Sequence, residues 1–117
     1  MAATGEPLSI VDLHTHTTAS DGVISPAELV ALAGQRGLRF LAVTDHDSTD
    51  GVDEAIAAGQ RLGVTVIPGI ELGTETEHGE VHLLGYFIDH RDPVLQERLT
   101  EFREGRERRV ARIVERL

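Results

Sequence analysis

The chain has 117 residues, with 20 acidic residues, 11 arginines and no lysine, and its formal net charge is −9 when histidine is counted as neutral. Its length fits one domain or part of one, and its 40% hydrophobic content excludes a disordered chain. Because cysteine is absent, disulfides, thiolate metal sites and cysteine nucleophiles are excluded. The acidic balance disfavours a broad nucleic-acid surface, although bound cations could reverse the local field.

Residues 1–8 lack the basic cluster and apolar run of a signal peptide, and no apolar stretch approaches the roughly 20 residues that span a bilayer. We therefore expect a cytoplasmic protein with no membrane partner. Charge divides the chain at His90. The segment up to His90 has 14 acidic residues, 3 arginines and all six histidines, whereas the segment after it has 6 acidic residues and 8 arginines. The first segment therefore holds the candidate chemistry.

Short apolar runs alternate with helical patterns along the first part of the chain. These runs predict strands over residues 9–13, 39–43 and 64–67. A helix is predicted over residues 26–35, with Ser25 as its N-cap, and a second helix over residues 51–62, with Asp50 as a candidate N-cap. Strand–helix alternation with short connections favours parallel strands in an open α/β sheet or a barrel.

The remainder of the chain is less regular. Residues 73–80 are rich in acidic residues and predict a loop, and the apolar run over residues 81–87 predicts a fourth strand. A long helix is predicted from Asp92 and Pro93 onward, and its apolar stripe is still running at Leu117 with no terminating Gly, Asn or Pro. We therefore expect the sequence to be cut from a longer protein.

Polar clusters follow each of the first three predicted strands, where α/β sheets and barrels gather their ligands. Asp12, His14 and His16 are spaced two apart at the end of the first strand, so we expect their side chains to face one rim and share an ion. His46 follows the second strand and Glu71 the third. A carboxylate such as Glu71 could bridge two divalent ions and so activate a water for in-line attack on phosphorus.

Each of these residues also has a plainer interpretation. An isolated His-x-His pair can be a solvated surface feature, and the loop residues Glu75, Glu77 and Glu80 are expected to be solvated. His82 lies in an apolar run, where a lone histidine is more often a satisfied core residue. His78 and His90 are predicted to be surface histidines. The repetition of histidine and carboxylate at separate strand ends is what favours a metal site.

Four segments resemble, in order, the first four motifs of the PHP family, named for polymerase and histidinol phosphatase. They are DLHTHTTASDG at residues 12–22, VTDHDSTDG at 43–51, PGIEL at 68–72 and VHLLGYFID at 81–89. The resemblance covers nearly all of residues 10–89 and is strongest to the stand-alone phosphoesterases of the family. The polymerase-attached branch is less similar in its first motif.

The resemblance implies an α/β fold, the N-terminal half of a distorted (βα)7 barrel with parallel strands and flanking helices, followed by a long helix. Residues 8–90 would form this partial PHP domain, and the Arg-rich helix over residues 91–117 would begin an inserted helical lid domain. Two or three divalent ions of Mn, Zn or Fe are implied. Their ligands would be His14, His16, Asp21, His46, Glu71 and His82. Glu71 and Asp12 would be the catalytic carboxylates, Glu71 by bridging metals and Asp12 by orienting a ligand histidine.

The implied activity is hydrolysis of a phosphorylated metabolite or nucleotide by a metal-bound hydroxide. Three alternatives stay open: a 5'-3' exonuclease acting on nucleic acid, which is the less favoured partner; a non-catalytic metal-binding or interaction module; and a metal-dependent amidohydrolase. The family's later ligands, typically two histidines and an Asp-x-His motif, are absent from the sequence. We therefore expect weak or no activity from these 117 residues alone, and self-association through the strand edges of a half-barrel.

Overall fold

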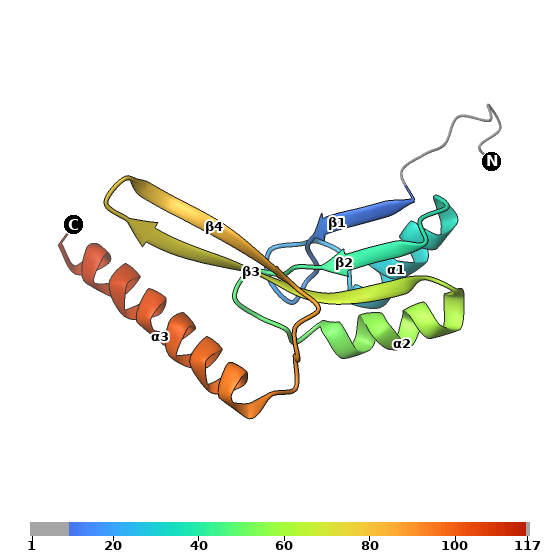
Figure 1. Cartoon of the computed structure of the whole chain (residues 1–117). Helices are drawn as coiled ribbons and strands as arrows, with labels where there is room; N and C mark the ends of the chain where they lie inside the picture. The colour runs from blue at the N-terminus through green and yellow to red at the C-terminus, as the bar shows by residue number, and fades with distance from the viewer. Residues whose placement is uncertain (1–9, 117) are drawn as a thin grey trace.

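The computed structural model describes residues 10–116, and Figure 1 shows its elements in chain order. They are β1 (Val11–Thr15), α1 (Pro26–Gln35), β2 (Phe40–Val43), α2 (Val52–Leu62), β3 (Thr65–Thr76), β4 (Gly79–Tyr86) and α3 (Pro93–Glu115). The predicted alternation of strands and helices, closed by a long helix, is confirmed.

The four strands form one curled sheet in the order β1-β2-β3-β4. β1, β2 and the first part of β3 run parallel, which confirms the α/β half-barrel. β4 is the exception to the parallel arrangement, because it pairs antiparallel with β3 from Gly69 to Thr76. Antiparallel neighbours can be joined by a tight turn, and here β3 and β4 form a long hairpin that extends away from α1 and α2 (Figure 1).

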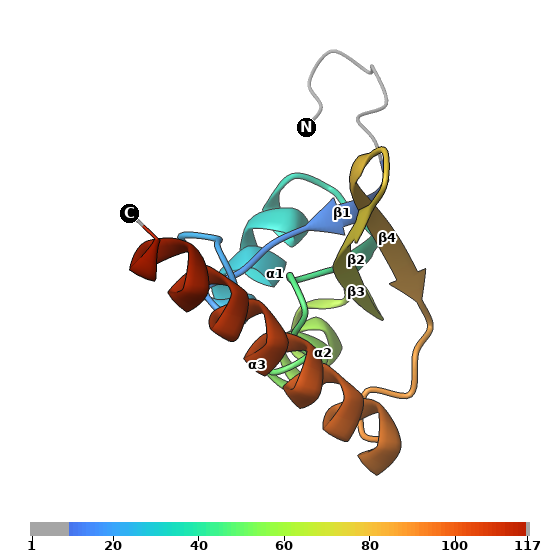
Figure 2. The same ribbon diagram turned by 90° about the vertical axis from the view of Figure 1, so that its left-hand side faces the viewer.

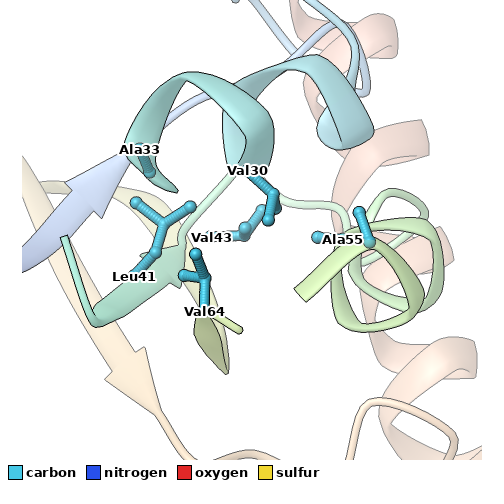
Figure 3. Close-up of a cluster of buried hydrophobic side chains, with 7 residues drawn as sticks. Val30, Ala33, Leu41, Val43, Ala55 and Val64 are labelled. Carbon is cyan, nitrogen blue, oxygen red and sulfur yellow. The ribbon is translucent and has the colours of Figure 1, made fainter. Parts of the chain in front are cut away.

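The hydrophobic core lies between the sheet and two helices. α1 and α2 pack side by side against one face of the strands (Figures 1 and 2). Seven buried side chains from these elements meet in one cluster (Figure 3), namely Val30, Ala33, Leu41, Val43, Ala55, Ala58 and Val64. Burial of an aliphatic side chain stabilises a fold by about 1.5–3 kcal/mol. The cluster therefore holds the parallel strands in register, and so fixes the positions of the residues that follow each strand.

β3 is much longer than the sequence pattern predicts. It continues to Thr76 instead of ending near Ile67, so the expectation of a loop from Gly73 is wrong. The chain reverses at residues 77–78, and β4 begins at Gly79, whose φ of 118° few other residues adopt. The acidic segment is thus the tip of an exposed hairpin.

The two short helices begin differently. Ser25 caps α1 as predicted, because its hydroxyl accepts the backbone N–H of Glu28 at 3.2 Å. The expected capping of α2 by Asp50 is wrong, since Gly51 occupies the cap position and the helix has no side-chain capping hydrogen bond. Asp50 instead donates its backbone N–H to the Ser48 hydroxyl at 3.1 Å. The turn before α2 is therefore stabilised by serine.

α3 begins where the sequence predicts. The Asp92 carboxylate caps it by accepting the backbone N–H of Val94 at 3.3 Å. The helix runs alongside the β3–β4 hairpin (Figures 1 and 2), and Leu99 is its buried side chain. Within residues 10–116, no helix combines the length and the apolar character that crossing a membrane requires.

Candidate metal centre

Glu71 is the centre of a cluster of histidines at the rim of the sheet. Its residue is only 5% exposed. Its Oε1 lies 2.8 Å from His14 Nε2 and 3.1 Å from His16 Nε2, and its Oε2 lies 2.7 Å from His82 Nδ1. His46 Nδ1 is farther away, 3.9 Å from Oε1. One buried carboxylate therefore faces four imidazoles that come from distant parts of the chain.

Asp21 faces the same cluster from the loop that follows β1. Its Oδ2 lies 3.2 Å from His46 Nε2, and its Oδ1 lies 3.5 Å from His16 Nδ1. The rings of His16 and His46 are stacked, with centroids 4.5 Å apart. His16 Nδ1 is buried and makes no hydrogen bond within the described part of the chain. Leaving such an atom unpaired costs about 1–3 kcal/mol, so this nitrogen is poised for a ligand.

The turn after β1 depends on a close backbone approach. A Cβ atom at Gly22 would lie 2.7 Å from the backbone carbonyl of His16, so a larger residue would clash. The Gly22 N–H also donates to the Thr17 carbonyl at 2.8 Å, which closes the turn. Glycine at this position therefore allows the loop to fold back and brings Asp21 beside His16.

Backbone hydrogen bonds join the loop after β2 to the middle of β3. Asp47 N–H donates to the Glu71 carbonyl at 2.9 Å, and Glu71 N–H donates to the Asp45 carbonyl at 3.0 Å. His46 and Glu71 are paired in this short parallel bridge. Because neighbouring strands are only about 4.8 Å apart, the bridge places the two side chains next to each other.

A buried carboxylate connects the first loop to the second. Asp45 is 1% exposed and accepts three hydrogen bonds. The donors are the Thr17 N–H at 2.6 Å, the Thr17 hydroxyl at 2.7 Å and the Ser20 hydroxyl at 2.7 Å. A buried charge is stable only where such bonds replace its hydration. Asp45 therefore holds the segment that carries His16 against the segment that carries His46.

The histidines shift the protonation equilibria of the cluster. Burial would raise the pKa of Glu71, but hydrogen bonds from His14 and His82 outweigh it and hold this pKa below its usual range. Hydrogen bonding to Glu71 raises the pKa of His82, and a second contact, with Glu80 at 3.1 Å from Nε2, adds to the effect. The metal-free cluster therefore favours an ionised Glu71 and a protonated His82.

The donor set fits divalent metal ions. Three overlapping groups each have their ligand atoms within 4.8 Å of one another: His14, His16 and Glu71; His16, Asp21 and His46; and His46, Glu71 and His82. Imidazole and carboxylate together suit Mn, Fe and Zn. His16 belongs to two of these groups, and its unpaired Nδ1 faces Asp21 Oδ1 in one of them, so a cation bound there would satisfy this nitrogen.

The structure brings together all six side chains that the sequence predicts as ligands. Asp12 differs, because its carboxylate accepts the backbone N–H of His14 at 3.2 Å and it lines a small hollow with Leu29 of α1 and Arg36, which directly follows α1. Among the contacts of residues 10–116, none joins Asp12 to a histidine ring. Its role in orienting a ligand histidine stays a prediction.

The other two histidines lie outside the cluster. His78 is exposed on the hairpin turn, as predicted. His90 is less exposed than a surface histidine, at 15% for its side chain, and its Nε2 lies 2.8 Å from Asp53. Hydrogen bonds from His90 and then Arg91 hold the pKa of Asp53 below its usual value. This group links the segment before α3 to α2.

For the buried carboxylates Asp45 and Asp47, the sequence suggests no more than capping of the helix that follows. The sequence signal was available, because both flank His46 in a segment that needs only one helix cap. The sequence does not indicate their partners, because these lie far along the chain. Asp47, for example, pairs at 2.5 Å with Arg106 of α3.

Comparison with known proteins agrees with this geometry. The family profile described as PHP domain matches residues 12–107. The chain is 41% identical over 106 residues to a 5'-3' exoribonuclease of Haemophilus influenzae, covering 91% of this chain and 39% of that protein. It is 41% identical over 96 residues to a 3',5'-nucleoside bisphosphate phosphatase of Chromobacterium violaceum, covering 82% of this chain and 34% of that protein.

A solved structure gives the same assignment. A Bifidobacterium adolescentis protein, provisionally named a metal-dependent phosphoesterase, superposes with a TM-score of 0.82 at 36% identity, covering 94% of this chain and 38% of that one. The chain thus spans less than two fifths of the length of each of these three proteins. The motifs, the half-barrel and the histidine cluster all agree with the profile match, and the chain belongs to the PHP domain family.

Proposed function

We propose that the chain is part of a metal-dependent phosphoesterase that hydrolyses a phosphorylated metabolite or nucleotide. The observation that carries this proposal is the convergence of four imidazoles and one further carboxylate, Asp21, around Glu71. Bound divalent metals would supply Lewis-acid stabilisation of a phosphoryl group and would lower the pKa of a water. No thiol is available, and the cluster offers no serine or threonine paired with a histidine within the described residues.

The six side chains divide into three groups of donors for two or three ions. His14 and His16 would hold the first ion with Glu71, and Glu71 would bridge to a second ion held by His82. Asp21 and His46 would serve a third position. Glu71 is suited to bridging, because its two oxygens already face different histidines. The identity of the ions, Mn, Zn or Fe, stays a prediction.

The relatives support the class of substrate. One is named for a nucleoside bisphosphate and another for exonucleolytic cleavage of RNA, and both substrates contain phosphate esters. We therefore propose small phosphorylated molecules as the substrate class. The cytoplasmic location stays a prediction.

We also propose that the full turnover belongs to a longer protein. The chain spans 34–39% of the length of the relatives it matches. In this proposal residues 8–90 form the first part of the barrel, and the helix within residues 91–117 starts a lid over the metal centre. Further ligands from the rest of a barrel would complete the three donor groups.

The test is phosphate release from adenosine 3',5'-bisphosphate with Mn²⁺, by this chain and by the longest open reading frame that contains it. The longer protein is expected to turn over the substrate, to lose activity with EDTA, and to lose it again in a Glu71→Gln variant, which keeps the side-chain shape. The chain alone is expected to be weakly active or inactive. Hydrolysis that persists both in EDTA and in Glu71→Gln would contradict the proposal.

A second candidate is 5'-3' exonuclease activity, because the Haemophilus relative is named for it and α3 carries several arginines. The same proteins are assayed on 5'-phosphorylated RNA. They are also assayed on an N-acyl amino acid, which tests the amidohydrolase alternative. Faster release of nucleotides from RNA than of phosphate from the bisphosphate would favour the exonuclease. Metal uptake without turnover of any substrate by the longer protein would favour a non-catalytic module.

A further inference from the structure

Asp47 is the most constrained residue beside the candidate metal centre. It directly follows His46, is 2% exposed, and has a φ of 50°. Residues other than glycine rarely adopt this left-handed conformation, although aspartate tolerates it better than most. Such a conformation persists only where the surrounding contacts hold it. The contacts of Asp47 therefore decide where His46 sits.

Two of these contacts come from β3. The Asp47 N–H donates to the Glu71 carbonyl at 2.9 Å, and Asp47 Oδ1 accepts the Gly73 N–H at 3.4 Å. They fix the loop to the strand that carries Glu71. They leave the backbone carbonyl of Asp47 and its second carboxylate oxygen for other partners.

α3 supplies those partners through two arginines. Arg103 Nη1 donates to the Asp47 carbonyl at 2.7 Å, and Arg106 Nη1 pairs with Asp47 Oδ2 at 2.5 Å. Arg106 Nη2 also donates to the Gly73 carbonyl at 3.3 Å. The two arginines are three residues apart and so lie on one face of the helix. A guanidinium holds its N–H donors in a fixed planar fork, an arrangement that the compact ammonium of lysine cannot reproduce.

We propose that Arg106, assisted by Arg103, is a positioning residue that holds the proposed metal ligand His46 in place through Asp47. α3 would thereby act as a clamp that joins the loop after β2 to β3 at the metal centre. The inference rests on the proposed function, since it assigns His46 a metal to bind. It gives α3 a role in forming the metal site, and that role is not evident from the ligand residues alone.

The experiment compares metal affinity and the position of the His46 ring. Arg106→Leu removes the clamp, and Arg112→Gln, an exposed arginine further along α3, is the matched control. Loss of a group that orients a metal ligand typically weakens metal binding about 10–100-fold. We expect Mn²⁺ affinity to fall at least about tenfold in Arg106→Leu and to stay within about twofold in Arg112→Gln.

The His46 ring is followed by NMR in the metal-free chain. Its ring signals are expected to move in Arg106→Leu, because its contact with Asp21 is released, and to stay in place in Arg112→Gln. The Arg106→Leu variant leaves the buried Asp47 carboxylate unpaired and could fail to fold for that reason. A double variant, Asp47→Asn with Arg106→Leu, removes both charges of the pair. It therefore separates the positioning of His46 from the stability of the fold. It is expected to fold while the His46 signals still move, and Arg106→Lys is expected to restore folding but only part of the metal affinity.

Unmoved His46 signals in a folded Arg106→Leu chain or in the double variant, with Mn²⁺ affinity within about twofold of the original chain, would overturn the inference while leaving the proposed function intact. If the unaltered chain takes up no metal, the proposed function fails. The NMR comparison then still decides whether α3 positions His46.

Discussion

The cluster around Glu71 contains more histidine ring nitrogens than its two carboxylates can pair by hydrogen bonding. A neutral imidazole has one donor and one acceptor nitrogen, and four imidazoles here share the acceptors of two carboxylates. One of these ring nitrogens, His16 Nδ1, is buried without a hydrogen-bond partner among the described residues. Cations remove this imbalance, which is the physical reason to assign the cluster to metal.

The pH dependence of His82 follows from its contacts. Hydrogen bonding to Glu71 and to Glu80 raises its pKa above the ordinary value of about 6.5. The stabilisation from the protonated pair is present below about pH 6.5 and is lost as the pH rises through the raised pKa. NMR titration of the metal-free chain should give a midpoint for His82 above about 6.5.

A Glu80→Gln variant provides the control, because it removes one of the two contacts that raise this pKa. The midpoint of His82 should fall toward its ordinary value in this variant but should not pass below it, since Glu71 remains. Protons compete with metal for His82, so metal uptake should strengthen as the pH rises through the midpoint. A midpoint below the ordinary value in the unaltered chain would be inconsistent with the contacts described.

Asp45 gives a prediction about stability. Replacing it with alanine removes the acceptor of three hydrogen bonds and leaves the Thr17 N–H buried without a partner. The free energy of unfolding should fall by about 3 kcal/mol, as measured by urea denaturation of the metal-free chain. Asp50→Ala is the matched control, because Asp50 is exposed and caps no helix. Equal effects of the two substitutions would refute the role given to Asp45.

The sequence could predict which side chains form the cluster around Glu71 but not the residues that position them. His16 and His46 follow β1 and β2, His14 lies near the end of β1, and Glu71 lies in β3 just past its parallel pairing with β2. These positions meet at one rim, as expected for the carboxyl ends of parallel strands. The expected direction of Asp12 assumed a regular strand, whereas the pairing of β1 with β2 shifts register between Asp12 and Thr15. Such an irregularity ends the simple alternation of faces, and nothing in the local sequence marks it.

At the scale of elements, β3 has two parts with different partners. Its first part pairs with β2 inside the core, and its second part pairs with β4 in a hairpin that is largely exposed. The apolar run at residues 64–67 therefore predicted the first part correctly. Ile70 and Glu71 at the start of this second part are buried, but the tip of the hairpin and most of β4 are exposed and need no buried face. The acidic residues near the tip therefore hid the end of a regular strand from a prediction based on hydrophobic periodicity.

α3 packs mainly through one apolar side chain and several polar contacts. Leu99 is its buried residue and is 3% exposed. Leu99→Ala should lower the free energy of unfolding by about 2–3 kcal/mol, and should make α3 more sensitive to limited proteolysis. Val110→Ala, on an exposed stretch of the same helix, is the control. Identical cleavage rates for the two variants would show that Leu99 does not anchor the helix.

At the scale of the whole molecule, the half-barrel leaves two strands at the sheet edges. β1 and β4 each have one strand neighbour among residues 10–116, and exposed apolar side chains accompany them, including Leu83 at 55% and Phe87 at 76%. Open strand edges with apolar side chains favour association. The half-barrel implied by the family resemblance predicts these open edges, and self-association through them stays a prediction.

Sedimentation velocity over a range of concentrations should therefore show reversible self-association of the chain. Leu83→Lys should weaken this association, because it places a charge on the β4 edge. Val23→Lys is the matched control, since Val23 is 92% exposed in the loop after β1. A chain that stays monomeric at every concentration, or an equal effect of both lysines, would show that the open edge is not the cause.

The central claim is that the cluster around Glu71 binds metal, and elemental analysis of the purified chain by plasma mass spectrometry tests it most directly. After loading with manganese or zinc, the unaltered chain should hold about two metal ions, and a His14→Ala, His16→Ala double variant should lose them. His78→Ala is the control outside the cluster and should retain them. Metal content near zero in the unaltered chain, or equal content in the double variant, would contradict the account.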